Sequence, residues 1–197
     1  MTITYELGNS LYINITNRCS NDCIFCVRNI ADTVNGKDNL WLEREPTTDE
    51  IIADLNARDL AKYDEVVFCG FGEPMIRWED VFVISEWLKR NNSRIVRLNT
   101  NGHGNLIAKQ DITPKLAGKI DIVSISLNAK NASEYDKVCK SEYGEKAYDA
   151  LLEFAKLAAG YARVVLTVVD DMSDDDIIAC REIAENLGVE FRVREII

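Results

Sequence analysis

The chain has 197 residues, of which 47% are hydrophobic and 28% charged, so its composition is that of a globular protein with a sizeable core. Lys and Arg total 23 against 33 Asp and Glu, and the resulting net charge of −10 argues against general binding to nucleic-acid backbones or anionic membranes. The apolar runs are far shorter than the roughly 20 residues of a membrane span, and the first residues lack the pattern of a secretion signal. We therefore expect a cytoplasmic protein.

Short β-type runs alternate with longer helical stretches along the chain. The expected strands are 10–16, 65–69, 94–99, 121–127, 163–169 and 190–194. The expected helices are 48–62, 79–91, 105–118, 131–159 with a break near 141–144, and 174–187. Several strands are nearly continuous apolar runs, which is typical of a parallel sheet covered on both faces. Six β/α units are too few for the closed eight-stranded barrel. They predict an α/β domain, either an open partial (β/α)6 barrel or a doubly wound sheet.

Residues 17–45 form a stretch without clear periodicity that is long for a connection, and loops of this length are usually functional. Three of the six cysteines lie in it, directly after the first expected strand. A disulfide framework is not expected in a cytoplasmic chain. The other three cysteines are far apart, and we expect them to be structural, although a function for Cys139 stays open: Cys69, Cys139 and Cys180.

The crowded cysteines have the spacing C-x3-C-x2-C: Cys19, Cys23 and Cys26. Three thiolates this close in sequence can surround one inorganic centre. A structural zinc site needs a fourth Cys or His, and the single histidine, His103, is far away in the sequence. A complete iron–sulfur site also needs four ligands. The pattern therefore predicts a cluster with one iron left open, while a zinc site completed by a distant residue is the alternative.

This spacing after a first strand, with Phe25 just before the third cysteine, resembles the radical S-adenosylmethionine (radical SAM) superfamily. The resemblance implies an open partial (β/α)6 TIM-like barrel and a [4Fe–4S] cluster on the three cysteines. It further implies reductive cleavage of SAM to a 5′-deoxyadenosyl radical, which abstracts hydrogen from a substrate. An external electron donor of the flavodoxin or ferredoxin type would be required, and Phe25 would lie near the adenine. The competing interpretation is a zinc- or cluster-binding structural or sensor module without turnover.

Further motifs lie where strands of the predicted sheet end. Gly70-Phe-Gly-Glu-Pro74 resembles the family's G-G-E-P segment, and the resemblance makes Gly72, Glu73 and Pro74 cofactor-binding residues, with Glu73 contacting the amino group of SAM. Two later strand ends would complete the SAM contacts through Thr100, Asn101, Ser126 and Asn128. Structural hydrogen bonding is the alternative for these side chains, since a buried polar group without a partner is costly.

Three more residues near the expected mouth of the barrel have open roles. Arg192 and Arg194 share one face of the last strand, where they could hold a substrate anion or pair with surface acids. His103 follows the Thr100-Asn-Gly turn and could contact substrate or be an ordinary surface residue.

The resemblance covers the whole chain, 1–197, as a single radical SAM core domain. The motifs around Tyr12–Cys19, Asn39–Glu43 and Val67–Pro74 are similar to those of the small radical SAM proteins associated with TatD-type hydrolases, which suggests such a hydrolase as a partner. The segment that would cap the mouth of the barrel is short, and no cysteine-rich extension follows the sixth strand. The short cap favours a macromolecular substrate or a partner that completes the pocket, and the lack of the extension gives no sign of auxiliary clusters.

Overall fold

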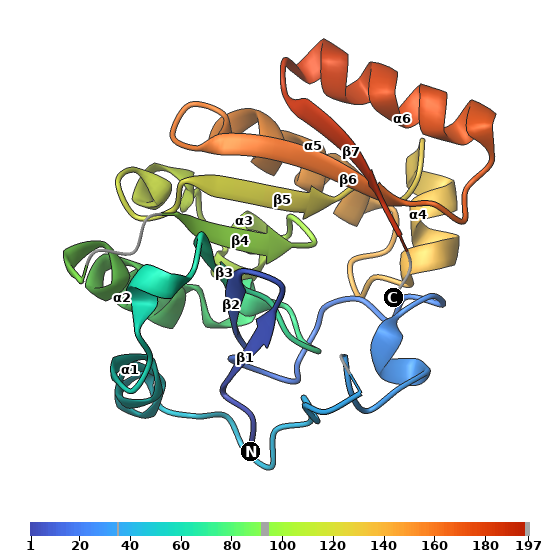
Figure 1. Ribbon diagram of the computed structural model, residues 1–197. Helices are drawn as coiled ribbons and strands as arrows, with labels where there is room; N and C mark the ends of the chain where they lie inside the picture. The colour runs from blue at the N-terminus through green and yellow to red at the C-terminus, as the bar shows by residue number, and fades with distance from the viewer. Residues whose placement is uncertain (35, 92–94, 196–197) are drawn as a thin grey trace.

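The computed structural model describes residues 1–34, 36–91 and 95–195, which build one seven-stranded sheet (Figure 1). Its strands follow one another in the order of the chain: β1 (Thr4–Leu7), β2 (Ser10–Ile13), β3 (Glu65–Phe68), β4 (Val96–Thr100), β5 (Ile122–Ser126), β6 (Arg163–Val169) and β7 (Glu190–Arg194). Strands β2 to β7 are parallel. A doubly wound sheet would reverse its strand order part-way, so this order confirms the open partial barrel.

The first strand was not predicted. β1 pairs antiparallel with β2 through a tight turn in which Gly8 has φ 57°, a backbone conformation that glycine adopts without strain. The strand predicted at 94–99 starts at Val96 in the structure, and Arg94 lies outside the described residues.

The two faces of the sheet differ in chemistry. Strand side chains that face the helices are apolar and form one core with them, including Leu11, Val66, Leu98, Val123 and Leu166. The residues between them face away from the helices, on what we call the inner face; it includes Tyr12, Arg97, Asn99, Ser124, Ser126, Thr167, Arg192 and Arg194. Strands β3 and β6 are buried along nearly their whole length, on both faces, as their apolar runs predicted. On the other parallel strands the inner face is mainly polar, and the inner-face valines of β3 and β6 do not join the main core.

In the part of the chain that the structure describes, six α-helices connect the strands: α1 (Thr48–Asn56), α2 (Trp78–Arg90), α3 (Gly104–Ala108), α4 (Ala132–Cys139), α5 (Lys146–Ala158) and α6 (Asp174–Leu187). Short 3-10 helices cover Val27–Asn29, Leu60–Lys62, Pro74–Arg77 and Thr113–Leu116. Thr47 and Glu50 form a capping box at the start of α1, where the sequence predicted a helix to begin. The helix expected at 105–118 was wrong, because α3 ends at Ala108 and Lys109 turns left-handed (φ 55°). None of the described helices has the length and apolar character of a membrane span.

Candidate cofactor site

The three crowded cysteines lie in the loop that follows β2, which we call the cysteine loop (residues 17–45). In Figure 1 this blue segment lies at the edge of the sheet to which the parallel strands point. Its backbone is fixed to the end of α4, because the N–H of Asp22 donates to the carbonyl of Cys139 (3.0 Å) and the N–H of Ile24 to that of Val138 (2.9 Å). All three thiols are half-buried.

A buried hydrogen-bond network joins the cysteine loop to the sheet and to α4. The Ser20 hydroxyl contacts Nδ1 of His103 (3.0 Å) and accepts from Nδ2 of Asn101 (2.9 Å). On the other side of the imidazole, the Tyr135 hydroxyl contacts Nε2 of His103 (3.3 Å) and accepts from Nδ2 of Asn21 (2.9 Å). The segment after β4, helix α4 and the cysteine loop are thereby held together, and we call these five residues the loop clamp.

His103 was expected at the mouth of the barrel or on the surface, but it is fully buried. Burial lowers the pKa of His103 to about 4, so the imidazole is neutral at pH 7 and one ring nitrogen is free to accept a hydrogen bond. The sequence places His103 two residues after Asn101, but its contacts with Ser20 and Tyr135 come from distant segments that no local pattern reveals.

Glu73 joins the ends of β3 and β4. Its carboxylate accepts hydrogen bonds from the Thr100 hydroxyl (2.7 Å), the backbone N–H of Asn101 (2.7 Å) and the backbone N–H of Met75 (2.9 Å). Burial raises the pKa of Glu73 to about 7, although these hydrogen bonds favour the charged form. A carboxylate has about four acceptor positions, so roughly one remains for a ligand. Thr100 and Asn101 thus both have partners within the protein: Thr100 donates to Glu73, and Asn101 donates to Glu73 and to Ser20.

Gly72 lies where two chain segments come too close for a side chain. A Cβ atom built on Gly72 would lie 2.3 Å from the carbonyl oxygen of Thr16 and 2.5 Å from that of Arg18. The N–H of Glu73 donates to the same Arg18 carbonyl (2.8 Å). The glycine is needed because the segment after β3 packs directly on the start of the cysteine loop.

Burial raises the pKa of the thiols in the cysteine loop. The pKa of Cys19 rises to about 12, with the nearby Glu73 carboxylate adding to the effect, and burial also raises that of Cys26. The pKa of Cys23 is raised chiefly by a hydrogen bond with the thiol of Cys139. A bound metal displaces such protons. Cys139, for which a function was left open, is fully buried next to Cys23.

Unpaired polar atoms lie on the inner face and at the strand ends beside the loop. Among the described residues, the side-chain oxygens of Asn99 and Asn128 are buried without a hydrogen-bond partner. Asn128 has φ 54° and its amide nitrogen lies 3.9 Å from the sulfur of Cys139. Ser126, half-buried on the inner face, ends β5. Buried acceptors without donors are rare in native proteins, and they fit a ligand that carries amino and hydroxyl groups.

The remaining predicted residues lie around this edge. Phe25 is half-buried and packs against the main core, and Pro74 is buried at the start of its 3-10 helix. Arg192 and Arg194 are both on the inner face, opposite Thr167 and Val169 of β6. Asn99 was not among the predicted contacts, although its alternation with Arg97 in β4 would have placed it on the inner face.

The described residues do not bring three cysteine, histidine or acidic side chains together around a single point, as one metal ion would require. The three thiols instead come from one short loop beside unpaired polar atoms. Comparison with known families matches residues 13–184 to the Radical SAM superfamily. The chain belongs to the radical SAM superfamily.

Curated radical SAM relatives agree with this assignment. The chain is 29% identical over 184 residues to a probable GTP 3′,8-cyclase of Methanosarcina acetivorans, covering 90% of this chain and 51% of that protein. It is 22% identical over 187 residues to human molybdenum cofactor biosynthesis protein 1, covering 94% and 28% respectively. The chain thus spans about half or less of the length of these relatives.

A solved structure described as TYW1 with a lysine-pyruvate adduct bound has the same fold. It superposes with a TM-score of 0.64 at 18% identity and covers 96% of this chain and 65% of that one. Radical SAM proteins use a [4Fe–4S] cluster and SAM, as the sequence predicted, and the chain has the core of a radical SAM enzyme.

Proposed function

We propose that this protein cleaves SAM reductively and uses the resulting radical to abstract hydrogen from a substrate. The observation that carries the proposal is the position of Cys19, Cys23 and Cys26 in a single loop at the carboxyl edge of a parallel half-barrel, in a chain that matches the radical SAM family. Active sites of α/β folds lie at this edge of the sheet. The domain is proposed to extend over 1–197.

The three thiolates would hold the cluster, and the cluster supplies the electron that breaks the sulfonium bond of SAM. Asn99, Ser126 and Asn128 would bind SAM, because their polar groups at this edge have room for further hydrogen bonds. Phe25, Gly72 and Pro74 would line the SAM site, as the family resemblance implies.

Glu73, Thr100 and Asn101 have a different role in this proposal. Their side chains are satisfied mainly within the protein, so they act as positioning residues that fix the ends of β3 and β4 under the cysteine loop. The remaining acceptor position of Glu73 could take the amino group of SAM. Preorganised donors and acceptors of this kind need no rearrangement when the ligand binds.

Partners of the reaction follow from its chemistry. An electron donor of the flavodoxin or ferredoxin type must reduce the cluster, and a macromolecular substrate or a TatD-type hydrolase would complete the site. The similarity to TatD-associated proteins rests on the sequence motifs, since the relatives described above have other names. A structural or sensor module that binds zinc or a cluster without turnover is the competing function.

The decisive experiment is anaerobic reconstitution with iron and sulfide, reduction with dithionite, addition of SAM and measurement of 5′-deoxyadenosine. We expect a brown protein that forms 5′-deoxyadenosine. Cys26→Ala should abolish both properties, while Cys180→Ser, remote in the core of α6, serves as the matched control. A fully loaded cluster without product, and without a change of its electron paramagnetic resonance spectrum on adding SAM, would exclude the proposed reaction. A colourless protein that contains stoichiometric zinc would favour the competing function, a structural or sensor module without turnover.

A further inference from the structure

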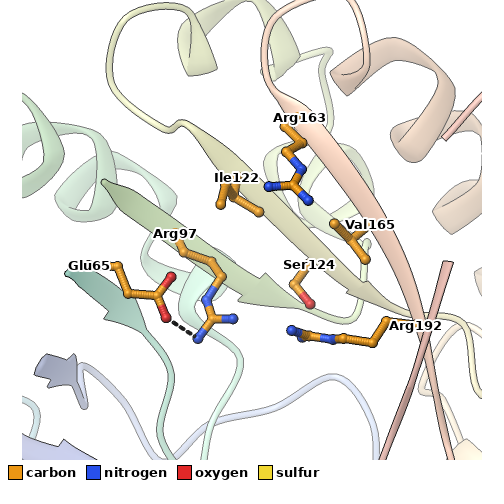
Figure 2. Close-up of a pocket in the computed structure, with 7 residues that line it drawn as sticks. All are labelled: Glu65, Arg97, Ile122, Ser124, Arg163, Val165 and Arg192. Atoms are coloured by element: carbon orange, nitrogen blue, oxygen red, sulfur yellow. Dashed lines mark ion pairs between the residues drawn. The ribbon is translucent and has the colours of Figure 1, made fainter. Parts of the chain in front are cut away.

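A pocket of about 260 Å³ opens on the inner face of the sheet, at the amino-terminal halves of the strands. Figure 2 shows the seven side chains that line it: Glu65, Arg97, Ile122, Ser124, Arg163, Val165 and Arg192. Three of the seven are arginines and one is a glutamate, in a chain with a net charge of −10. A cationic pocket in an acidic protein cannot be explained by overall composition.

Two of the three arginines are already paired. Arg97 forms an ion pair with Glu65 (2.8 Å), which fixes its position on the pocket wall, and a hydrogen bond to the Tyr12 hydroxyl (3.3 Å). Arg163 forms a bidentate pair with Glu190, with both N–O distances 2.5 Å. The two glutamates neutralise much of the positive charge of Arg97 and Arg163.

Two groups in the pocket have unused donor capacity. No ion pair or hydrogen bond of the Arg192 guanidinium is found within residues 1–34, 36–91 and 95–195. In the same part of the chain, Nε of Arg97 is buried without an acceptor. In Figure 2 Arg97 and Arg192 extend toward each other from β4 and β7, with Ser124 of β5 between them. A buried N–H without an acceptor is unfavourable, so a ligand that supplies oxygen acceptors is favoured here.

We propose that this pocket binds an oxyanion of the substrate, a phosphate or a carboxylate group, with Arg192 as its main contact and Arg97 and Ser124 as supporting donors. Arginine suits this ligand because its planar fork matches the two oxygens of either group. The proposal rests on the function proposed above, because it assigns the pocket to the substrate of that reaction.

The position of the pocket fits an anchor for the substrate. Ser124 precedes Ser126 by two residues on β5, and Arg192 precedes Arg194 by two residues on β7, so the pocket lies about 7 Å below the edge where SAM is proposed to bind. The volume is smaller than the roughly 300–1,000 Å³ of sites for whole ligands. It therefore holds one end of a substrate whose reacting carbon lies higher, at the cysteine loop.

The test uses the reconstituted holoprotein under anaerobic conditions and three probes: inorganic phosphate, pyrophosphate and succinate. Binding is measured by isothermal titration calorimetry for wild type, Arg192→Gln and Arg90→Gln. Arg90 is the matched control because it is exposed on α2 and pairs with Glu86, away from the pocket. We expect a saturable site for one probe class, weakened about tenfold or more in Arg192→Gln and unchanged in Arg90→Gln.

Phosphate or pyrophosphate binding would identify a phosphate-bearing substrate, and succinate binding a carboxylate. Absence of saturable binding in wild type, or equal binding by Arg192→Gln and wild type, would overturn the proposal. Thermal unfolding of each variant verifies that it is folded, which is expected because Arg192 is exposed on the edge strand. Formation of 5′-deoxyadenosine by wild type tests the proposed SAM cleavage separately. Binding without SAM cleavage would refute the function and leave the anion site, whereas cleavage without binding would refute only the anion site.

Discussion

The loop clamp gives a quantitative prediction for Tyr135→Phe. The substitution removes one hydroxyl and keeps the ring, so packing around this fully buried side chain is preserved. It leaves Nε2 of His103 and Nδ2 of Asn21 without their partner, at sites that are 0% and 6% exposed. Each buried polar group left unsatisfied costs about 1–3 kcal/mol, and we expect a total loss of about 2–4 kcal/mol.

Urea unfolding of the apoprotein under reducing conditions measures this loss. With a slope of about 2 kcal/mol/M for a chain of this size, the midpoint should fall by about 1–2 M. Tyr161→Phe is the matched control, because Tyr161 is 44% exposed and its hydroxyl makes no hydrogen bond found among the described residues. Its unfolding free energy should stay within about 0.5 kcal/mol of wild type.

A loss below about 0.5 kcal/mol for Tyr135→Phe would mean that water or a rearranged side chain replaces the hydroxyl, and that the clamp contributes nothing. Reconstitution provides a second readout. Because the clamp fixes the residues between Cys19 and Cys23, the variant should retain less iron than Tyr161→Phe after identical treatment. If Tyr135→Phe lost stability but kept as much iron as Tyr161→Phe, the clamp would contribute to global stability without positioning the cysteine loop.

Further predictions concern the thiols and the two buried titratable groups. Each single Ala variant of the loop cysteines should lose the cluster, whereas Ser variants of the other three should keep wild-type iron; Cys139→Ser is the most stringent of these, because a loss there would identify a fourth ligand next to Cys23. The lowered pKa of His103 means that the unfolded state binds its proton more tightly, so acidification from about pH 6.5 to about pH 4 should cost up to about 3 kcal/mol of stability. The raised pKa of Glu73 acts in the opposite direction: stability increases as pH falls from about 7 to about 4.5. In Glu73→Gln the loss of stability on acidification should therefore be steeper than in wild type. Identical pH dependence of the unfolding free energy in the two proteins would contradict the raised pKa of Glu73, and a stability that does not fall between pH 6.5 and pH 4 even in Glu73→Gln would contradict the lowered pKa of His103.

The fold was largely predictable because each parallel strand is a separate apolar run followed by a helix with its own start signal. Thr47 with Glu50 and Ser173 before three aspartates are local features, and both start helices as expected. The errors come from non-local effects. β1 is only four residues long and depends on its pairing with β2, and the segment after Ala108 leaves the helix because Asn105 and Asp111 hydrogen-bond to its backbone instead.

In the candidate site, too, local features were predictable from the sequence and contacts between distant segments were not. Spacing alone singled out the three cysteines proposed to hold the cluster, since a candidate ligand set close in sequence is visible without a structure. The roles of Thr100 and Asn101 were not accessible in this way, because their partners, Glu73 and Ser20, come from other segments. Burial of His103 and Cys139 likewise depends on how α4 packs on the cysteine loop, which is a tertiary contact.

The two faces of the sheet separate stability from chemistry in this protein. Residues that face the helices, such as Leu98 and Val123, carry the helix packing, and truncating Leu98 to Ala would cost about 2–5 kcal/mol. Inner-face residues such as Ser124 and Arg192 contribute little to that core, so they can change at small cost to folding. On β5 the proposed anion contact Ser124 and the proposed SAM contact Ser126 are neighbours on the same face. A substitution at Ser124 can thus alter the proposed substrate contact while Ser126, at the proposed SAM edge, and the residues packed against the helices stay the same.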